Sequence, residues 1–432
     1  MSETNYGSRT VPFVGGTYYD SRFCILVVGL VGFADTIKGL SGFCATLGMV
    51  MFMVRFTALL MLFVTARSVS GQEPAIEKLS VGGIDFEIFR NSDSISQAIA
   101  INNQGSVIGT REVAQDAGAT FRMIPFYIGT EGKKDIGIPK SYTNFEVVGL
   151  SDTDMIIGYA TRPLKHKDGS LIGAVWNART EEFKLLPLAE GDVANQAQDI
   201  SADGKRITGY TTGPMRMRPT LWEWDEKTRD WKVMILPTLH DQNPYLMSGQ
   251  LMISPNGKKI AGCCTERFRS DGLPDSSLYL WTENEAGEWE RSRLSEEQFY
   301  LRGINDHGEM AGSLLGASEG RQPCYVSPSG DFTHLSLLPD DASGEAKDIN
   351  NASVIVGFSD DPAGAEGGPE LCSWSKDGTA KRVGEPGSSY GMILGINDSG
   401  QMAGMIEFSP ETKDPSTNEP AEGLLLAFRT LK

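Results

Sequence analysis

The chain of 432 residues is long enough for two or three average domains, although a repeat fold of this length can form one domain. Its hydrophobic fraction of 40% and charged fraction of 22% are those of a globular protein that can bury a large core. Residues 1–71 carry a net charge of +2, which leaves −19 of the total −17 for the remainder. Such an acidic body would repel a phosphate backbone, which disfavours general nucleic-acid binding.

Residues 1–71 form an N-terminal extension in which polar residues are followed by apolar runs. Residues 53–71 have the order of a secretory signal, with a basic residue at Arg55, an apolar run over 56–66 and small residues up to Gly71. We therefore predict cleavage near Gly71 and a body that is secreted or extracytoplasmic, in a periplasm or on a cell surface.

A membrane anchor is the alternative interpretation of the same extension. If translation begins at Met1 rather than Met53, the apolar run Phe43–Ala66 is long enough to span a bilayer. Contact with a membrane is expected in that case alone. Residues 72–83 are interpreted as a linker to the body.

One unit recurs seven times along residues 84–432, with copies that start 45 to 53 residues apart. Each copy has an apolar residue, Asn or Ser, two variable residues, a turn residue, a short apolar run and a Gly. A period of this size is that of one four-stranded propeller blade. The copies are INNQGSVIG (Ile101–Gly109), LSDTDMIIG (Leu150–Gly158), ISADGKRITG (Ile200–Gly209), ISPNGKKIAG (Ile253–Gly262), INDHGEMAG (Ile304–Gly312), INNASVIVG (Ile349–Gly357) and INDSGQMAG (Ile396–Gly404).

Each unit also contains four short β-type runs, separated by turns rich in Asn, Asp and Gly that are typical of hairpins. The Gly that ends each copy lies inside the second run, where it indicates a close approach by another backbone segment. In the second unit the four runs are 144–151, 155–161, 173–178 and 182–188.

The seventh unit begins at Ile396 and contains three runs, because the chain stops 36 residues later. An unassigned β-type run, Ile84–Arg90, precedes the first unit. We predict that this run supplies the missing fourth strand, so that the ring closes without an exposed edge. The predicted fold is an all-β, seven-bladed β-propeller over 84–432; a linear stack would need capping ends, and none is evident.

The repeat pattern resembles that of the HAF-repeat proteins, a group of largely exported bacterial proteins. Their units have the form apolar-Asn-x-x-Gly-x-Val-x-Gly followed by Ala-Phe-x-Trp. Copies such as Ile396–Gly404 match the first half well, whereas the second half is degenerate, with partial matches at Ala174–Trp176 and Ala427–Phe428. The resemblance implies the repeat architecture and export, and it brings no catalytic residues to this chain.

Neither a metal nor another cofactor is expected. No Cys and His stand at zinc-ligand spacing, and turns such as Asn305–Glu309 lack the spacing of a calcium loop. Asn, Asp and Gly are the residues that hairpin turns require, so the turns are interpreted as structural.

Recurring third-run residues are interpreted as core. Cys324 and Cys372 occupy one column and are predicted to be small buried side chains rather than a disulfide. A Trp recurs in four units, which indicates packing between blades more than a surface for stacking sugars. The four are Trp176, Trp222, Trp281 and Trp374.

The connections after the second run are long and polar, and in the first five units they are rich in basic residues. Variable loops on a rigid scaffold often carry binding functions, and Arg offers forked donors to carboxylate, sulfate or phosphate. We interpret them as an anion-recognising face, with ordinary solvated loop charge as the alternative. The candidate residues are Arg111, Arg162, Arg216, Arg218, Arg267, Arg269 and Arg321.

No catalytic signature is present in the sequence. His166, among basic neighbours, is a candidate acid or base, although a lone exposed His is usually only solvated. We expect a monomeric, non-enzymatic protein that binds a glycan, an anionic small molecule or an extracytoplasmic protein. The alternatives are a polysaccharide-acting propeller hydrolase or lyase, with His166 near a central pocket, and a purely structural component of the cell envelope.

Overall fold

The structure of the chain is a computed structural model that divides into two units, Met1–Val69 and Ser70–Lys432. All described residues belong to the second unit, and within them no helix is long and apolar enough to cross a membrane. The described ranges are 75–81, 84–90, 95–115, 120–163, 171–213, 216–238, 247–268, 274–315, 320–361, 368–384, 389–408 and 426–430.

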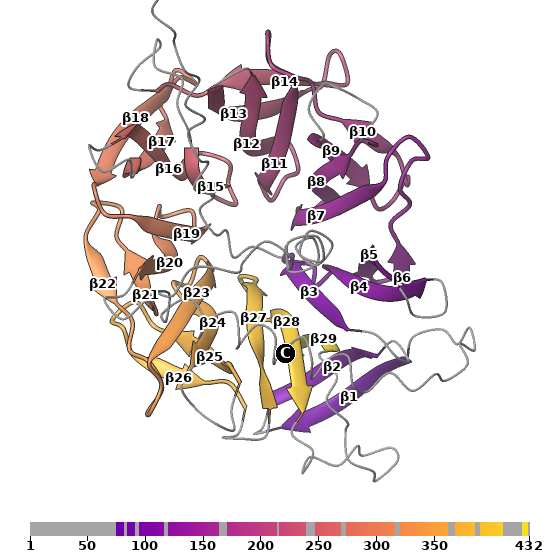
Figure 1. Ribbon diagram of the computed structural model, residues 1–432, viewed down its shortest axis with the longest axis vertical. Helices are drawn as coiled ribbons and strands as arrows, with labels where there is room; N and C mark the ends of the chain where they lie inside the picture. Colours follow the sequence, from indigo (N-terminus) through magenta and orange to yellow (C-terminus); the bar gives the residue numbers. More distant parts are fainter. Residues whose placement is uncertain are drawn as a thin grey trace, which may run out of the picture. The chain divides into compact units, whose positions relative to one another are not determined.

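Seven antiparallel sheets stand in a ring, and the first strand of each lies nearest the centre (Figure 1). This arrangement confirms the predicted seven-bladed β-propeller. Blades 1 to 6 have four strands each: β3 (Ser96–Ile101), β4 (Val107–Gln115), β5 (Thr120–Gly129) and β6 (Gly132–Asp135); β7 (Asn144–Leu150), β8 (Met155–Thr161), β9 (Leu171–Asn177) and β10 (Phe183–Leu185); β11 (Ala194–Ile200), β12 (Arg206–Gly213), β13 (Arg216–Asp225) and β14 (Asp230–Ile235); β15 (Met247–Ile253), β16 (Lys259–Phe268), β17 (Pro274–Glu283) and β18 (Trp289–Ser295); β19 (Phe299–Ile304), β20 (Met310–Leu315), β21 (Arg321–Val326) and β22 (Phe332–His334); β23 (Ser343–Ile349), β24 (Ile355–Asp360), β25 (Glu370–Trp374) and β26 (Ala380–Arg382).

Blade 7 is built from both ends of the chain, as the sequence predicted. Strand β2 pairs with β29 in antiparallel register, with Ile88 opposite Phe428, and the early and late strands lie side by side (Figure 1). The rings of Phe86 and Phe428 meet edge to face, with centroids 5.3 Å apart. The blade consists of β27 (Ser389–Ile396), β28 (Met402–Phe408), β29 (Leu426–Thr430), β2 (Ile84–Arg90) and β1 (Ala75–Val81).

The interpretation of residues 72–83 as a linker is wrong for its central part. Strand β1 occupies 75–81 and pairs with β2, from Ala75 opposite Arg90 to Val81 opposite Ile84. The two residues between the strands are Gly82-Gly83, a dipeptide typical of a two-residue hairpin loop. Blade 7 therefore has five strands, and β1 forms its outer edge.

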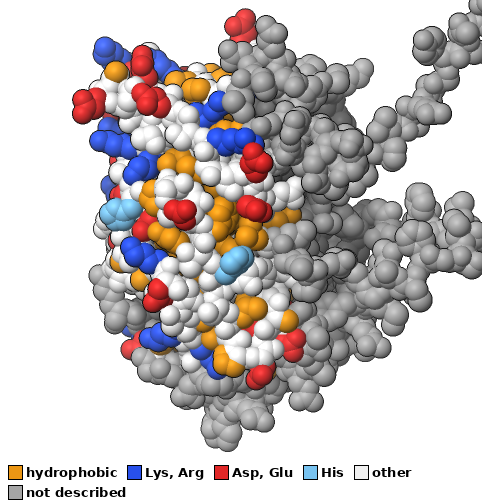
Figure 2. Space-filling model, turned by 90° about the vertical axis from the view of Figure 1, so that its left-hand side faces the viewer, with side chains coloured by type: hydrophobic (Ala, Val, Ile, Leu, Met, Phe, Trp, Pro, Cys, Tyr) orange, Lys and Arg blue, Asp and Glu red, His pale blue; other side chains and the backbone are white. Residues whose placement is uncertain are grey.

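One side of the body mixes charges of both signs. Figure 2 shows one side of the molecule, on which acidic and basic side chains are interspersed with apolar ones. A mixed surface of this kind supports solubility and by itself identifies no partner.

Six of the repeat glycines lie against the backbone of their own first strand. In blade 3 the register of β11 shifts between Ala197 and Asp199, which marks a β-bulge. A Cβ on Gly209 would lie 2.0 Å from the carbonyl oxygen of Gln196, a distance that no side chain tolerates. The same approach, at 1.9 to 2.1 Å, occurs at Gly109, Gly158, Gly209, Gly312, Gly357 and Gly404. The predicted close approach is confirmed at these six positions.

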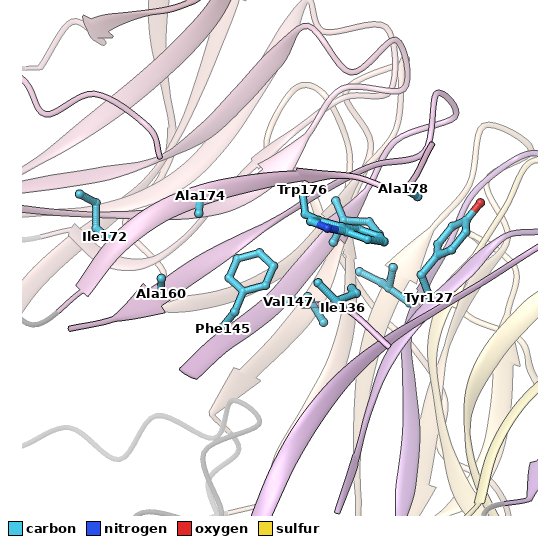
Figure 3. Close-up of a cluster of buried hydrophobic side chains, with 11 residues drawn as sticks. Tyr127, Ile136, Phe145, Val147, Ala160, Ile172, Ala174, Trp176 and Ala178 are labelled. Carbon is cyan, nitrogen blue, oxygen red and sulfur yellow. The ribbon is translucent and has the colours of Figure 1, made fainter. Parts of the chain in front are cut away.

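The third-strand tryptophans are buried between blades. Trp176 is 3% exposed and packs with Tyr127 of blade 1 and with Phe145 and Val147 of its own blade (Figure 3). Trp222 donates its indole N–H to a carbonyl oxygen of the preceding connection, at 2.9 Å. The other two tryptophans of this column are also buried, so the prediction of core packing is confirmed.

The first Asn of the repeat stabilises its turn and also links the turn to the next blade. The side-chain oxygen of Asn397 accepts the backbone N–H of Ser399 and Gln401, while its amide group donates to the carbonyl of Asn102, at 2.9 Å. That last bond joins blade 7 to blade 1. The interpretation of the Asn-rich turns as structural is therefore confirmed.

A second set of hydrogen bonds joins the seven turns into a closed circle. In each link a backbone N–H of one turn donates to an oxygen of the next turn, over 2.7 to 2.9 Å. The links are Asn103 to Asp152, Asp152 to Ala202, Ala202 to Pro255, Asn256 to Asp306, Asp306 to Asn351, Asn351 to Asp398, and Asp398 to Asn103.

Replacing Gly209 with Ala should destabilise the fold, because its Cβ would collide with a backbone carbonyl rather than a movable side chain. We expect the free energy of unfolding to fall by about 3 kcal/mol, measured by urea denaturation. Gly137→Ala is the control, since a Cβ there meets nothing within 4 Å. Equal stabilities of the two variants would contradict the close approach.

Candidate functional site

Most of the described arginines of the predicted anion-recognising face are already paired within the fold. Arg162, which follows the end of β8, is partly exposed. The other three arginines with described side chains each contact a carboxylate. The contacts are Arg111 Nη2 to Asp135 Oδ2 at 2.7 Å, Arg218 Nη2 to Asp192 Oδ2 at 2.6 Å, and Arg321 Nη1 to Glu345 Oε2 at 2.6 Å. An anionic ligand would therefore compete with carboxylates of the protein at these positions.

The remaining predicted site residues are not described at the level of side chains. Arg216 begins β13 and Arg267 lies in β16, and only their backbones are described. Arg269 and His166 lie outside the described residues. A role of these four residues in binding or catalysis stays a prediction.

One predicted arginine, Arg321, belongs to a larger cationic cluster between blades 5 and 6. The carboxylate of Glu345 contacts Arg302 Nε at 2.6 Å, Arg321 Nη1 at 2.6 Å and Lys347 Nζ at 3.0 Å. The Glu345 side chain is 4% exposed, while the three cations retain 10–16% exposure. We call these four residues the Glu345 cluster.

The cluster holds Glu345 firmly in its ionised form. Removal from water alone would raise the pKa of this carboxyl group, but Lys347, Arg302 and Arg321 together lower it to about 2. The cations are in turn held in fixed positions around a carboxylate. Such an arrangement is preorganised, because the side chains do not need to be gathered when an anion arrives.

The bulges of the first strands place these cations. Arg302 is the inserted residue of β19, between Leu301 and Gly303, and Lys347 is the inserted residue of β23. The same position in the other bulged blades carries an apolar or amide residue: Ile99, Val148, Gln198 and Leu394. Two consecutive cations at this position therefore distinguish blades 5 and 6 from the rest of the ring.

An exposed aromatic side chain lies beside the cluster. Tyr300 is 36% exposed, and the Arg321 guanidinium lies over its ring, 4.9 Å from the centroid. Lys347 Nζ lies 5.5 Å from the centroid of Phe358. The site thus combines cationic donors with an aromatic surface, which suits a ligand that is part anion and part ring.

Sequence reasoning missed Arg302, Lys347, Glu345 and Tyr300, because it looked for binding residues in the long connections. All four lie on first strands, two or four residues before the apolar residue that opens the repeat. Aligning the repeats at those two positions would have shown that blades 5 and 6 both carry a cation two residues before the apolar residue.

Two carboxylates near the axis bridge neighbouring blades. Asp199 accepts backbone N–H groups from Ile200 and, in the next blade, Ile253, both at 2.8 Å. Asp348 does the same with Ile349 and Ile396. Loss of water raises the pKa of each Asp to about 7, and the N–H bonds only partly offset that rise.

The described residues contain no group of three or more His, Cys, Asp or Glu that could hold a metal ion. Cys324 and Cys372 are fully buried and form no disulfide, which confirms their interpretation as small core side chains. Burial raises the pKa of both thiols to about 12, so they are poor nucleophiles. No catalytic constellation is evident in this part of the chain.

The fold is shared with solved propellers, whereas no family model and no curated protein matches the chain. The β-propeller domain of the Trilobed protease from Pyrococcus furiosus, which has an open velcro topology, matches with a TM-score of 0.50 and 13% identity, over 78% of this chain and 95% of that chain. Oligogalacturonate lyase in complex with manganese also matches at 0.50 and 13%, over 83% and 96% of the two chains.

An acylaminoacyl peptidase from Pyrococcus horikoshii matches with a TM-score of 0.47 and 15% identity, over 77% of this chain and 51% of that chain. This chain therefore spans about half the length of that peptidase. At 13% identity the likeness to the Trilobed protease domain and to oligogalacturonate lyase shows the propeller fold and nothing about ligand or activity. The resemblance to HAF-repeat proteins stays a prediction.

The free energy of unfolding should depend on pH through Asp199. Because its folded pKa of about 7 lies above the ordinary value of 3.8, the folded state binds the proton more tightly, and its contribution to stability is lost as pH rises between those values. Between pH 5 and pH 8 this loss should be roughly 2.7 kcal/mol. Asp199→Asn should reduce the difference between the two pH values by that amount in urea denaturation.

Asp85→Asn, at an exposed position of β2, is the control for that measurement and should leave the pH dependence unchanged. The readout is the change in the free energy of unfolding with pH. The free energy at one pH is not sufficient, because Asn at 199 also loses one of the two backbone hydrogen bonds. An unchanged slope in Asp199→Asn would show that this carboxyl group titrates as it does in water.

Proposed function

We propose that this chain is an exported propeller that binds an anionic ligand through the edge of the ring where second strands end and third strands begin. The ligand is a glycan, an anionic small molecule or an acidic segment of an extracytoplasmic protein. The single observation that carries the proposal is the Glu345 cluster, in which three partly exposed cations surround one buried carboxylate.

The cluster differs from the other ion pairs on that edge. Arg111 and Arg218 each contact one carboxylate, a stoichiometry that is sufficient for a structural pair. Glu345 contacts three cations, two of them guanidinium groups, and guanidinium forks match carboxylate and phosphate oxygens. In a body of net charge −19, a local concentration of cations also gives an approaching anion one preferred position.

The location outside the cytoplasm belongs to the same proposal. Support comes from residues 53–71, whose basic residue, apolar run and small residues follow the order of a secretory signal. Detection of the purified protein with an N-terminus near residue 72 would test the cleavage. Retention of the apolar run Phe43–Ala66 in the mature protein would favour the membrane anchor instead.

A propeller hydrolase or lyase that acts on a polysaccharide is the alternative. Its support is the fold likeness to oligogalacturonate lyase, which is limited to architecture at 13% identity. In an enzyme of this kind the Glu345 cluster would bind acidic groups of the substrate, and His166 would be a candidate acid or base. Release of shortened products from an acidic polysaccharide, lost in His166→Ala, would favour this alternative.

Ligands that bind the folded protein should raise its melting temperature in a thermal-shift screen of sulfated, phosphorylated and uronic-acid compounds. At 100 times Kd the gain is about 2.7 kcal/mol, which is on the order of a few degrees for a domain of this size. The shift should disappear at high salt and in a variant that neutralises the whole cluster, Arg302→Gln, Arg321→Gln, Lys347→Gln and Glu345→Gln.

All four residues are changed together because Glu345 alone would remain as a buried, unpaired charge. The matched control replaces the pair on blade 1, Arg111→Gln with Asp135→Asn, and should keep the ligand-induced shift. A shift that survives in the cluster variant would place the anion elsewhere, and the absence of any shift across the screen would contradict the proposed function.

A further inference from the structure

A cavity of about 430 Å³ lies between blades 3 and 4, at the end of the ring that carries the circle of turns. Its size is that of a site for a small ligand, and its lining contains three carboxylates, three cations, an Asn and a Trp. We infer that this cavity binds a small zwitterion, such as an amino acid or a short peptide, with its carboxylate at Lys258 and its ammonium group at Glu223. The site is separate from the Glu345 cluster, which lies between blades 5 and 6.

The cavity follows from a feature of the sequence that blades 3 and 4 alone possess. Their repeat copies, Ile200–Gly209 and Ile253–Gly262, are each one residue longer than the other five. Each longer turn carries a Lys directly after its Gly, and both of these residues, Lys205 and Lys258, line the cavity. Because blades 3 and 4 are neighbours, the two longer turns border the same space (Figure 1).

Arg206 fixes the wall that the two blades share. Its Nη1 and Nη2 contact the two carboxylate oxygens of Glu283 at 2.8 and 2.6 Å, and Nη2 also contacts Glu223 Oε1 at 2.9 Å. Nη1 donates in addition to the carbonyl oxygen of Gly257, at 3.0 Å. Arg206 is thus a structural clamp, and two carboxylates on one guanidinium leave one negative charge uncompensated at this wall.

Glu223 presents that negative charge to the cavity. Its side chain is 37% exposed, against 15% for Glu283. Within the described residues, the contact of Oε1 with Arg206 is the only polar contact of the Glu223 carboxylate. Its second oxygen can therefore accept N–H groups from the ammonium group of a ligand.

Lys258 supplies the opposite charge. In the described part of the chain its Nζ makes no hydrogen bond or ion pair, whereas Lys205 Nζ lies 2.8 Å from Glu226. The hydrogen bond from Arg206 is the main cause that lowers the pKa of Glu283, and the charge of Lys258 adds to that lowering. The Lys258 ammonium group therefore lies within electrostatic range of the carboxylate wall.

Asn256 adds a second donor from the same turn. Its side-chain oxygen accepts the hydroxyl of Ser254 at 2.8 Å and the backbone N–H of Lys258 at 2.9 Å. The amide nitrogen of Asn256, which also lines the cavity, is the part of this side chain that can donate to a ligand carboxylate.

This distribution of charge favours a zwitterion over a ligand with one charge. A simple anion would bind Lys258 but would be repelled by Glu223, and a simple cation would meet the reverse. Trp224 contributes an apolar part of the wall, and its ring is held edge to face against Trp231, with centroids 5.5 Å apart. A short peptide with free termini satisfies both charges and can place its carbon atoms against this wall.

The test is calorimetric titration of the full chain with trialanine, N-acetyltrialanine and trialanine amide. Trialanine should bind about tenfold more tightly than either derivative, because each derivative lacks one of the two charges. In Lys258→Gln, trialanine and its amide should bind equally, while the acetyl derivative stays weaker. In Glu223→Gln, trialanine and the acetyl derivative should bind equally, while the amide stays weaker.

The matched controls are Lys227→Gln and Glu285→Gln, exposed residues on hairpins of the same two blades that do not line the cavity. Both should keep the preference for trialanine over its derivatives. Melting temperatures without ligand identify any variant that fails to fold. Lys258→Gln removes no contact among the described residues, so it should melt as the wild type does and keep the test decisive.

Equal affinity for the three ligands, or no binding of trialanine, would overturn the inference. A preference for trialanine over its amide that survives in Lys258→Gln would also overturn it. The variant that neutralises the Glu345 cluster should bind trialanine as the wild type does, and a loss there would place the peptide at that cluster instead. Failure of this inference is thereby distinguishable from failure of the proposed function, which the anion screen tests at a different site.

Discussion

The approach of the repeat Gly to the first strand is the constraint on which the rest of this structure depends. In six blades the carbonyl of the residue four before the repeat's apolar residue lies where a Cβ would otherwise be. A β-bulge brings that carbonyl into place, and it adds one residue to the strand nearest the axis. The packing at these six blades thus also creates six inserted positions, whose residue types differ from blade to blade.

Closure of the ring follows from two further interactions of different kinds. The turns bind one another through backbone N–H groups, which donate to side-chain oxygens of Asn or Asp in five links and to the backbone carbonyls of Ala202 and Pro255 in the other two. The amide after the apolar residue stabilises its own turn, as Asn397 does by accepting N–H groups of Ser399 and Gln401. On the opposite side of blade 7, β2 completes the sheet through Phe86 and Phe428. The circle of turns depends on directional hydrogen bonds, whereas the contact between Phe86 and Phe428 depends on buried apolar area. The two interactions therefore respond differently to heat and denaturant.

The fold could be predicted from the sequence because it is encoded seven times. Periodicity gave the blades, and the three-strand seventh unit indicated that Ile84–Arg90 would close the ring. The strand 75–81 was missed because it adds a fifth strand that no other blade has, although Gly82-Gly83 was a hairpin signal. The repeat period predicts the features that all blades share. It cannot predict a feature that one blade has alone, such as the fifth strand of blade 7.

The candidate site was harder to predict for the same reason. Arg321 was identified through its place in a long connection, but Arg302 and Lys347 lie in first strands, where the sequence analysis did not look for binding residues. Their significance depends on spatial neighbourhood across two blades, which sequence spacing does not give. Charge counting was also insufficient, because Arg111 has the same sequence context as Arg321 and is paired one to one with Asp135.

The stoichiometry of ion pairing is therefore a better guide to function here than the abundance of arginine. An acidic body can neutralise each isolated Arg with a local carboxylate, as Asp192 does for Arg218. Such a single pair contributes little to the free energy of unfolding. Keeping three cations around Glu345 costs electrostatic repulsion among them, and desolvation adds to that cost. The fold bears this cost at one place on the ring, beside the exposed ring of Tyr300, and this is why the anion-binding proposal centres on that place.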